Sequence, residues 1–296
     1  MSSSEFLKIS VVTPSFNQAN FLPTTLTSVL AQNYPNLEYR VIDGGSTDGT
    51  VQILQDYSAK LALWCSEPDG GQYDAINKGF RSSTGDIMAW INSDDMYTPW
   101  AFRVANEIFS TLPDVEWLTT LCPIVWSATG AATYCAQRGG YTRQSFLGGE
   151  NIHHSGWYAL GAIQQESVFW RRSLWQKAGG YLDTAYPLAA DFELWARFFQ
   201  HADLYTVSVP LGGFRYHGNQ RSVMQAEQYR AEAQKVLAAY GGHPMGRMRG
   251  MATKLVKDYI RLPYGLRRQA VKWGLKHTHK HCTFDAATQH WQVNDL

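Results

Sequence analysis

The chain has 296 residues, of which 45% are hydrophobic, and this is enough for a sizeable core in one large domain or in one domain with an appendage. Its four cysteines contain no C-x-x-C pair, which argues against a zinc cage or a redox motif, so we expect reduced thiols in a cytosolic protein. The sequence shows neither a signal peptide nor an apolar run of the ~18 residues that a membrane span needs.

The first half of the chain alternates between strand and helix patterns. Apolar segments predict strands at residues 8–13, 38–43, 61–66 and 86–91. Helical patterns start near residues 19 or 20, at 46–48 and after 70–71, and a further helix is expected to about residue 109, with Thr98 as N-cap and Pro99 as its first residue. Strands that alternate with helix-length segments predict an α/β fold with a largely parallel sheet.

The second half is more mixed. Residues 115–138 are β-rich and are expected to extend the sheet, whereas residues 139–162 have no clear period and predict a surface loop. Shorter patterns predict strands at 167–171 and 204–209 and helices at 173–178, 190–200 and 227–240. Residues 245–281 predict a basic helical extension that is broken at Pro263.

Carboxylates follow two of the predicted strands. Asp94 and Asp95 come just after the segment 86–91, where paired acids can bind Mg²⁺ or Mn²⁺ and leave open positions for phosphates. Asp43 ends the second strand before a glycine turn, where it can accept hydrogen bonds from a nucleobase or ribose, or act as a plain turn residue. The turn is neither a G-x-G-x-x-G fingerprint nor a P-loop, which removes the usual support for hydride transfer and ATP hydrolysis.

Five motifs carry a resemblance to a known family. They are Thr13-Pro14-Ser15-Phe16-Asn17, the run from Asp43 to Thr50, Asn77-Lys78-Gly79, Ser93-Asp94-Asp95, and the run from Asp191 to Trp195. Their order resembles that of family 2 glycosyltransferases over roughly residues 7–222. The resemblance implies a GT-A fold, a three-layer α/β sandwich with a mostly parallel central sheet. It divides the chain into a GT-A domain, residues 1–222, and a basic helical C-terminal extension, residues 223–296; within the domain, residues 1–96 bind the nucleotide sugar and residues 97–222 carry the acceptor site and the catalytic base.

The resemblance also implies roles on the donor side. Asp43 would contact the base, and Thr13, Pro14 and Ser15 would line the nucleoside pocket. In the D-x-D-type motif, Asp94 would meet the ribose and Asp95 would bind a divalent cation, Mn²⁺ or Mg²⁺. Because Ser93 stands at the first position of that motif, only one carboxylate of the motif lies near the ion, and metal affinity without nucleotide should be weak.

Further donor contacts are expected on a helix and on a late loop. Asp74, Asn77 and Lys78 are spaced to share one helix face, and Lys78 is a candidate contact for the diphosphate or sugar. The alternative is a solvated Asp–Lys pair. His217 and Arg221 are candidates near the metal or the diphosphate, with ordinary surface-loop roles as the alternative.

Catalysis and acceptor binding are expected in the second half. Asp191 would be the base that takes the acceptor proton, unless it only satisfies amides at a helix start. Glu193 would support the site or meet the acceptor, and its i, i+2 spacing from Asp191 puts the two acids on different helix faces, which argues against a glycosidase-style pair. Gln165 and Trp170 would lie beside the acceptor cleft, although a tryptophan here can also belong to the core.

The formal net charge of +1 hides an asymmetry. Residues 247–282 hold ten Lys and Arg against one acid, a net charge of +9, so the rest of the chain carries −8. Apolar residues interleave with these cations, a pattern of helices at anionic membrane surfaces, while packing on the chain's own domain is the alternative. No recognised nucleic-acid module accompanies the charge, and we expect no nucleic-acid partner.

The prediction is therefore an inverting glycosyltransferase that moves a sugar from a UDP- or GDP-linked donor to a saccharide or lipid-linked saccharide. The expected setting is surface polysaccharide assembly, in the cytoplasm or on the inner face of the cytoplasmic membrane. A sugar nucleotidyltransferase would need a Gly-rich, Arg-bearing loop after the first strand, which residues 13–18 lack. The other alternative is a non-catalytic sugar- or membrane-binding protein, and the intact Asp43, Asp95 and Asp191 argue against it.

Overall fold

The computed structural model describes residues 6–152, 160–218, 220, 224–243 and 278–296. These residues form a nine-stranded sheet in the order β13-β12-β10-β6-β9-β4-β1-β2-β3. Its strands are β1 (Ile9–Ser15), β2 (Leu37–Asp43), β3 (Leu63–Ser66), β4 (Ile87–Trp90), β6 (Trp117–Thr120), β9 (Phe169–Arg171), β10 (Tyr205–Val207), β12 (Lys280–Asp285) and β13 (His290–Asp295). Strands β4, β1, β2 and β3 run parallel, as the sequence predicts, and β9 is antiparallel to both of its neighbours.

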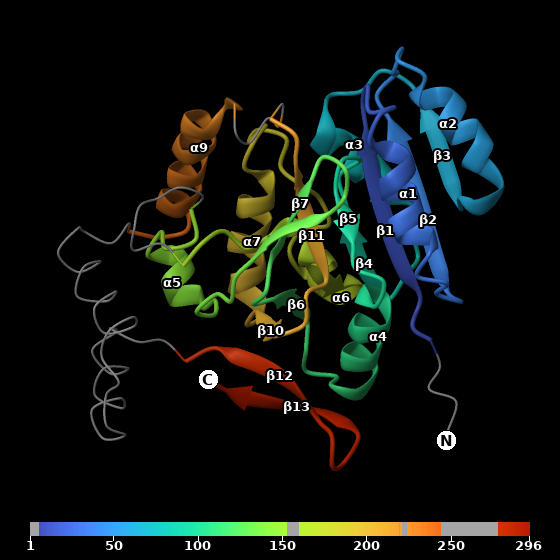
Figure 1. Ribbon diagram of the computed structural model, residues 1–296. Helices are drawn as coiled ribbons and strands as arrows, with labels where there is room; N and C mark the ends of the chain where they lie inside the picture. Colours follow the sequence, from blue (N-terminus) through green and yellow to red (C-terminus); the bar gives the residue numbers. More distant parts are fainter. Residues whose placement is uncertain (1–5, 153–159, 219, 221–223, 244–277) are drawn as a thin grey trace, which may run out of the picture.

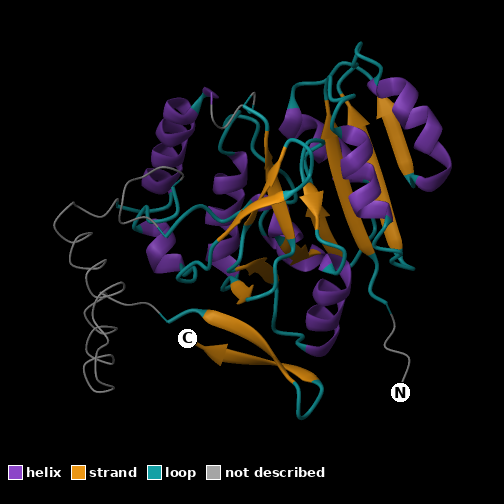
Figure 2. Cartoon of the chain, in the orientation of Figure 1, coloured by secondary structure: helices purple, strands orange, loops and turns teal. Residues whose placement is uncertain are grey.

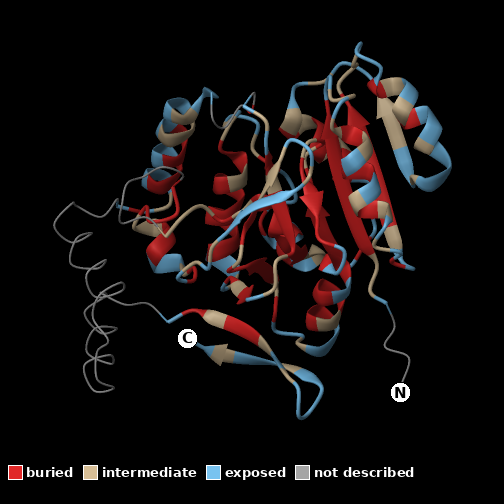
Figure 3. Ribbon diagram, in the orientation of Figure 1, coloured by how far each residue is buried: buried red, intermediate tan, exposed pale blue. Residues whose placement is uncertain are grey.

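Helices cover both faces of this sheet (Figures 1 and 2). They are α1 (Leu22–Leu30), α2 (Thr50–Tyr57), α3 (Gln72–Arg81), α4 (Ala101–Thr111), α5 (Arg143–Leu147), α6 (Arg172–Lys177), α7 (Ala190–His201) and α9 (Ala226–Ala239), with short 3₁₀ helices η1 (Ser58–Lys60) and η2 (Gln165–Ser167). Alternate residues of β4 point to opposite faces, because Met88 and Trp90 pack with α3, α6 and α7, while Ile87 and Ala89 pack with α1 and α4. The result is the expected three-layer α/β sandwich, with buried strands between half-exposed helices (Figure 3).

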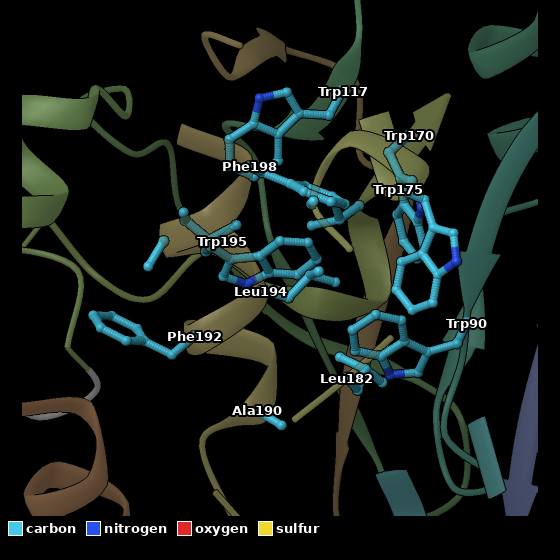
Figure 4. Close-up of a cluster of buried hydrophobic side chains, with 14 of the residues drawn as sticks. Trp90, Trp117, Trp170, Trp175, Leu182, Ala190, Phe192, Leu194, Trp195 and Phe198 are labelled. Atoms are coloured by element: carbon cyan, nitrogen blue, oxygen red, sulfur yellow. The ribbon is translucent and has the colours of Figure 1, made fainter. Parts of the chain in front are cut away.

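Tryptophans dominate the core on one face of the sheet (Figure 4). The ring of Trp195 on α7 stacks on Trp90 of β4, with ring centroids 5.8 Å apart, and on Trp117 of β6 at 5.6 Å. Large aromatic side chains bury much apolar area and have few rotamers, so these contacts are stiff. The start of α7 is therefore held at a fixed position relative to the carboxyl end of β4.

A smaller sheet completes the described fold. It has four strands in the order β5-β11-β7-β8, with β5 (Met96–Tyr97), β7 (Ile124–Ser127), β8 (Ala132–Cys135) and β11 (Gly212–Tyr216). The β-rich region expected at 115–138 therefore splits, since β6 joins the main sheet and β7 and β8 join the smaller one. The expected loop at 139–162 contains the helix α5, and residues 153–159 lie outside the described residues.

The C-terminal segment differs from the expectation of a helical extension. Residues 280–295 form a β-hairpin, in which β12 pairs in parallel with β10, so this segment extends the main sheet rather than leaving it (Figure 1). Cys282 of β12 is buried, and the Trp291 indole N–H donates to the Glu107 carboxylate of α4 at 3.0 Å. The helix expected at 227–240 is confirmed as α9, while residues 244–277, most of the basic extension, lie outside the described residues.

One helix start is also corrected. The N-cap of α4 is Trp100, not Thr98, because the Thr98 hydroxyl donates instead to the carbonyl oxygens of Pro210 and Leu211, both at 3.0 Å. Thr98 thereby ties the start of α4 to the chain just before β11. No helix among the described residues is long and apolar enough to cross a membrane.

Candidate active site

A cavity of about 690 Å³ opens where β1, β2, β3 and β4 end. Its volume lies in the range of small-molecule binding sites. Residues at the ends of these strands or just after them line one side, including Pro14, Ser15, Gly44, Asp69 and Asn92 to Asp95. The opposite side comes from the second half of the chain, including Tyr134, Arg138, Gln164 to Glu166, Asp191, Phe214 and His217. The cavity therefore lies between the two halves that the sequence assigned to donor and acceptor.

Asp95 is the most deeply buried acid of the predicted metal motif, with 1% of its surface exposed. Its carboxylate accepts hydrogen bonds from the backbone N–H of Arg215 at 2.8 Å and from the side-chain amide of Asn92 at 3.0 Å. Burial raises the pKa of Asp95 well above its usual value, and the charges of Glu166 and Asp94 raise this pKa further. A cation beside this carboxylate would reverse these unfavourable contributions.

Glu166 is a further acid at the cavity, and no sequence motif indicates it. Its buried carboxyl group lies close enough to that of Asp95 for the charge of Glu166 to raise the pKa of Asp95, and burial raises the pKa of Glu166 to about 7. Both side chains line the cavity. No local motif marks Glu166, because its partner Asp95 comes from a different strand end. The contact becomes visible only in the fold.

The two carboxyl groups fit a divalent cation. Mg²⁺ and Mn²⁺ prefer oxygen ligands and keep positions for water and phosphate oxygens. Within the described part of the chain, no group of three or more His, Cys, Asp or Glu side chains is arranged to hold a metal ion. An ion held by Asp95 and Glu166 would therefore need the donor and water as its other ligands. The weak metal affinity without nucleotide that the Ser93 position predicts stays a prediction.

Asp94 and His217 are brought together across the cavity wall. The His217 Nε2 lies 3.0 Å from the Asp94 Oδ2, and the imidazole stacks on Phe21 with ring centroids 4.4 Å apart. This places His217 beside the acidic motif, as the sequence predicts. Arg221, the other late candidate, lies outside the described residues.

Asp191 lies in the first turn of α7 and lines the same cavity. Burial raises its pKa to about 6, and its charge in turn raises the pKa of Glu166. The amides before the helix do not depend on Asp191, since Glu232 of α9 accepts hydrogen bonds from the N–H groups of Leu188 and Ala189 at 2.9 and 3.0 Å. Asp191 accepts one from its neighbour Phe192 at 2.7 Å. Asp191 therefore satisfies an amide at the start of α7, as the capping alternative predicts, and it also lines the cavity, as the base prediction requires.

The expected nucleoside pocket is only partly as the sequence predicts. Pro14 and Ser15 line the cavity, but Thr13 is buried, with its hydroxyl 3.0 Å from that of Tyr39. Asp43 is also fully buried, and it accepts hydrogen bonds from the N–H groups of Gly45 and Ser46 and from the Ser66 hydroxyl. Thr13 and Asp43 therefore stand behind the cavity wall, contrary to our expectation. Asp43 shapes the loop that carries Gly44.

Phe16 is exposed at the cavity, whereas Thr13 and Asp43 are buried. It follows β1 directly, lines the cavity and keeps 60% of its surface exposed. An exposed aromatic side chain at a cavity mouth offers a flat apolar face to a planar or ring-shaped ligand. The sequence signal was present, because an apolar residue directly after a buried strand has no helix or strand in which to bury itself.

The candidates on α3 do not line the main cavity. Lys78 pairs with Glu67 at 3.3 Å and with Asp74 at 3.5 Å, as the solvated-pair alternative predicts. Asn77 donates to the Leu182 carbonyl at 2.8 Å and accepts from the Leu182 N–H at 2.7 Å. The expectation that this face contacts the donor is therefore corrected. The start of α3 faces the cavity instead, through Gln72 and Tyr73.

Two acceptor candidates are also relocated. Trp170 has no exposed surface and belongs to the tryptophan core. Glu193 is buried, forms an ion pair with Arg197 at 2.6 Å and accepts a hydrogen bond from the Tyr240 hydroxyl at 2.8 Å. Gln165 does line the cavity, and its side-chain amide donates to the Trp90 carbonyl at 2.7 Å. Of the three, only Gln165 lines the cavity.

Comparisons with known proteins agree with this architecture. The family model described as glycosyl transferase family 2 matches residues 10–155. An uncharacterized glycosyltransferase of Mycobacterium tuberculosis is 33% identical over 191 residues, which cover 62% of this chain and 66% of that relative. One from Rickettsia prowazekii is 26% identical over 227 residues, 75% of this chain and 69% of the relative.

Solved structures show the same fold. TarS of S. aureus in complex with UDP-GlcNAc has a TM-score of 0.61 and 16% identity, over 90% of this chain and 79% of that chain. The mannosyltransferase PcManGT of Pyrobaculum calidifontis in complex with GDP-Man and Mn²⁺ has a TM-score of 0.51 and 17% identity, over 91% of this chain and 81% of that chain. The fold and its cavity thus define a GT-A protein. The chain belongs to glycosyltransferase family 2, a family of transferase enzymes.

Proposed function

We propose that this protein is an inverting glycosyltransferase that moves a sugar from a UDP- or GDP-linked donor to a hydroxyl of a saccharide or lipid-linked saccharide. The observation that carries the proposal is that Asp95, from the first half of the chain, and Glu166 and Asp191, from the second half, line one cavity. Inverting transfer needs both a stabilised diphosphate leaving group and a base for the incoming hydroxyl. These groups supply the two requirements.

The donor would occupy the side of the cavity that the first half of the chain lines. Phe16 offers an aromatic face to the base, and Asp94 accepts hydrogen bonds from ribose hydroxyls. Asp95 and Glu166 would hold the divalent cation, which when bound neutralises the charge that develops on the departing diphosphate. His217, held by Asp94 and Phe21, lies within the same wall and can donate a hydrogen bond to a phosphate oxygen.

Asp191 would accept the proton of the acceptor hydroxyl. A general base is most effective when its pKa lies near the working pH, and burial raises the pKa of Asp191 to about 6. The carboxylate is then ionised at neutral pH and still basic enough to take the proton. Gln165, hydrogen-bonded to the Trp90 backbone, is the expected acceptor contact beside it.

The donors named in the neighbouring structures support the class of substrate. TarS was solved with UDP-GlcNAc and PcManGT with GDP-Man and Mn²⁺. We therefore expect a screen of UDP- and GDP-sugars, with Mn²⁺ or Mg²⁺, to give nucleoside diphosphate release for at least one donor. A product of inverted anomeric configuration by NMR supports the mechanism, and a retained configuration contradicts it.

We also propose that the protein works at the inner face of the cytoplasmic membrane, in surface polysaccharide assembly, through the basic segment 247–282. The support is the sequence alone, a net charge of +9 with interleaved apolar residues, since residues 244–277 lie outside the described part of the structure. Wild-type protein should sediment with liposomes that contain anionic lipid and remain in solution with neutral ones. Replacement of Lys254, Lys257 and Arg261 by glutamine should shift the partition toward solution, and an unchanged partition would contradict the assignment.

A further inference from the structure

The charges that line the cavity are unequally matched. Five acids line it, namely Asp69, Asp94, Asp95, Glu166 and Asp191, and the described cationic or imidazole side chains that do so are Arg138 and His217. His217 is paired with Asp94. No described carboxylate lies within ion-pair distance of Arg138, even though the cavity is rich in acids. Arg138 is thus a cation inside the cavity that has no ion-pair partner among the described residues.

The position of Arg138 is structured, not that of a solvated surface side chain. Its Nε is buried and has no hydrogen-bond partner in the described protein. Its backbone N–H donates to the Leu121 carbonyl at 2.7 Å, which anchors the chain just after β8. The guanidinium lies against the backbone of Gly161, where a Cβ atom would come within 3.0 Å of Cζ and Nη1. Gly161 therefore leaves the space that the guanidinium occupies.

An arginine with a buried, unpaired donor and no counter-ion is energetically unfavourable when no ligand is bound. A buried donor without a partner loses its hydrogen bonds to water, and a partly desolvated charge without a counter-ion loses more. An anion bound in the cavity would supply both partners. A planar guanidinium suits carboxylate and phosphate groups, because it donates two parallel hydrogen bonds.

Arg138 lies on the acceptor side of the cavity. It follows the β7–β8 hairpin, drawn in green in Figure 1, whose Tyr134 also lines the cavity with 53% of its surface exposed. The charge of Arg138 acts on Tyr141, where it lowers a pKa that burial raises by a larger amount. The diphosphate corner, in contrast, is built by residues after β4 and by His217. An exposed aromatic ring and a cation that line the same side of one cavity suit a sugar that carries a negative group.

We propose that the acceptor carries an anionic group, a carboxylate or a phosphate, which binds Arg138 while the neighbouring sugar ring packs on Tyr134. The inference rests on the proposed function, because it assigns this side of the cavity to an acceptor saccharide. Two sources share the chemistry: a uronic acid within the acceptor, and the phosphate that links a saccharide to a carrier. Arg138 then determines which acceptors the enzyme selects.

The test compares three probes that share a glucosyl ring: neutral methyl glucoside, methyl glucuronide and glucose 1-phosphate. Binding is measured by saturation-transfer NMR titration of the full chain with saturating UDP and Mn²⁺, so that the donor side is occupied. Wild type should bind at least one anionic probe about tenfold or more tightly than the neutral probe, as charge-assisted hydrogen bonds predict. Preference for the glucuronide indicates a uronic acid, and preference for the phosphate indicates a carrier link.

Two variants and a control separate the possible outcomes. Arg138→Gln should lose the anionic preference and keep the affinity for methyl glucoside, and Arg138→Lys should restore part of it. The control is Arg143→Gln, since Arg143 pairs with Gln200 outside the cavity, and it should bind all probes as wild type does. Circular dichroism and the UDP affinity of each variant show that it is folded.

Three results would overturn the inference. They are equal binding of all probes to wild type, an anionic preference that survives in Arg138→Gln, and a loss of UDP affinity in Arg138→Gln as large as the loss for the anionic probe. The last result would assign Arg138 to the donor diphosphate. Absence of nucleoside diphosphate release from every donor would instead contradict the proposed function, and it is measured separately.

Discussion

At the residue scale, the buried carboxyl pair of Asp95 and Glu166 is the most unusual feature of the protein. Two carboxyl groups are buried together, and burial is the largest cause of the raised pKa of each. Without a cation, the fold favours the protonated forms. The buried pair therefore lowers the stability of the metal-free protein and favours binding of a divalent ion, and both effects can be measured.

The first prediction concerns stability and pH without metal. The folded-state pKa of Glu166, about 7, lies above its ordinary value of 4.5, so its contribution to stability is complete below pH 4.5 and is lost as pH rises through about 7. In EDTA, the free energy of unfolding should fall across this window by on the order of 2–3 kcal/mol. Glu166→Gln should flatten the fall, as urea titrations at pH 5 and pH 8 would show. Identical pH profiles would refute the burial argument.

The second prediction concerns the ion itself. Asp95→Asn and Glu166→Gln should each weaken Mn²⁺ binding in the presence of UDP by about tenfold or more, since each removes one oxygen charge from the site. Electron paramagnetic resonance of free Mn²⁺ measures this without turnover. Glu67→Gln is the matched control, because Glu67 pairs with Lys78 away from the cavity and should leave the affinity unchanged.

The third prediction concerns Asp191. Asp191→Asn should lower kcat by about 10²- to 10⁴-fold while UDP affinity stays near that of wild type. In the wild type, kcat should rise with pH and level off above about pH 6, because the base acts only when ionised and burial raises its pKa to about 6. An acidic limb near pH 4, or wild-type kcat in the variant, would place the base elsewhere.

At the element scale, α3 shows how a helix near a site can serve the fold. Asn77 joins α3 to the segment before α7 through two hydrogen bonds with the Leu182 backbone. We predict that Asn77→Ala costs about 1–3 kcal/mol of stability with little change in UDP affinity, because it leaves buried backbone groups unpaired. Lys78→Ala should change the stability by much less, since exposed ion pairs contribute little. Calorimetry and UDP titration of both variants distinguish this from a donor-binding role.

Elements with a local signal could be predicted from the sequence. The strands β1, β2, β3 and β4 are apolar runs, and α7 has an amphipathic pattern, so their order already indicated the fold. Glu166 and the location of Asp43 could not be predicted, because they depend on which oxygens meet after folding. Asp43 ends a strand, as a ligand-binding acid would, but the hydroxyl of Ser66 at the end of β3 donates a hydrogen bond to its carboxylate. The i, i+4 spacing of Asp74 and Lys78 on α3 likewise predicted a real ion pair, but it could not show that the pair lies outside the cavity.

At the scale of the whole molecule, the C-terminal hairpin is part of the main sheet. Its sequence alternates polar and apolar residues too weakly to be recognised, and only the parallel partner β10 gives it a place. We predict that deletion of residues 279–296 lowers the melting temperature and promotes association, since it exposes the edge of β10. Calorimetry and gel filtration would show this. A monomer of unchanged stability would mean that the hairpin is dispensable.

The late position of this hairpin affects how the protein is made. Synthesis proceeds from the N-terminus, so every residue around the cavity leaves the ribosome before β12 exists. During that interval β10 presents unpaired backbone groups to the cell, and nascent chains on one messenger lie close together. The chain therefore passes through a stage in which its ligand site can be assembled while its sheet is still open. Translation speed through residues 208–280 sets how long that vulnerable stage lasts.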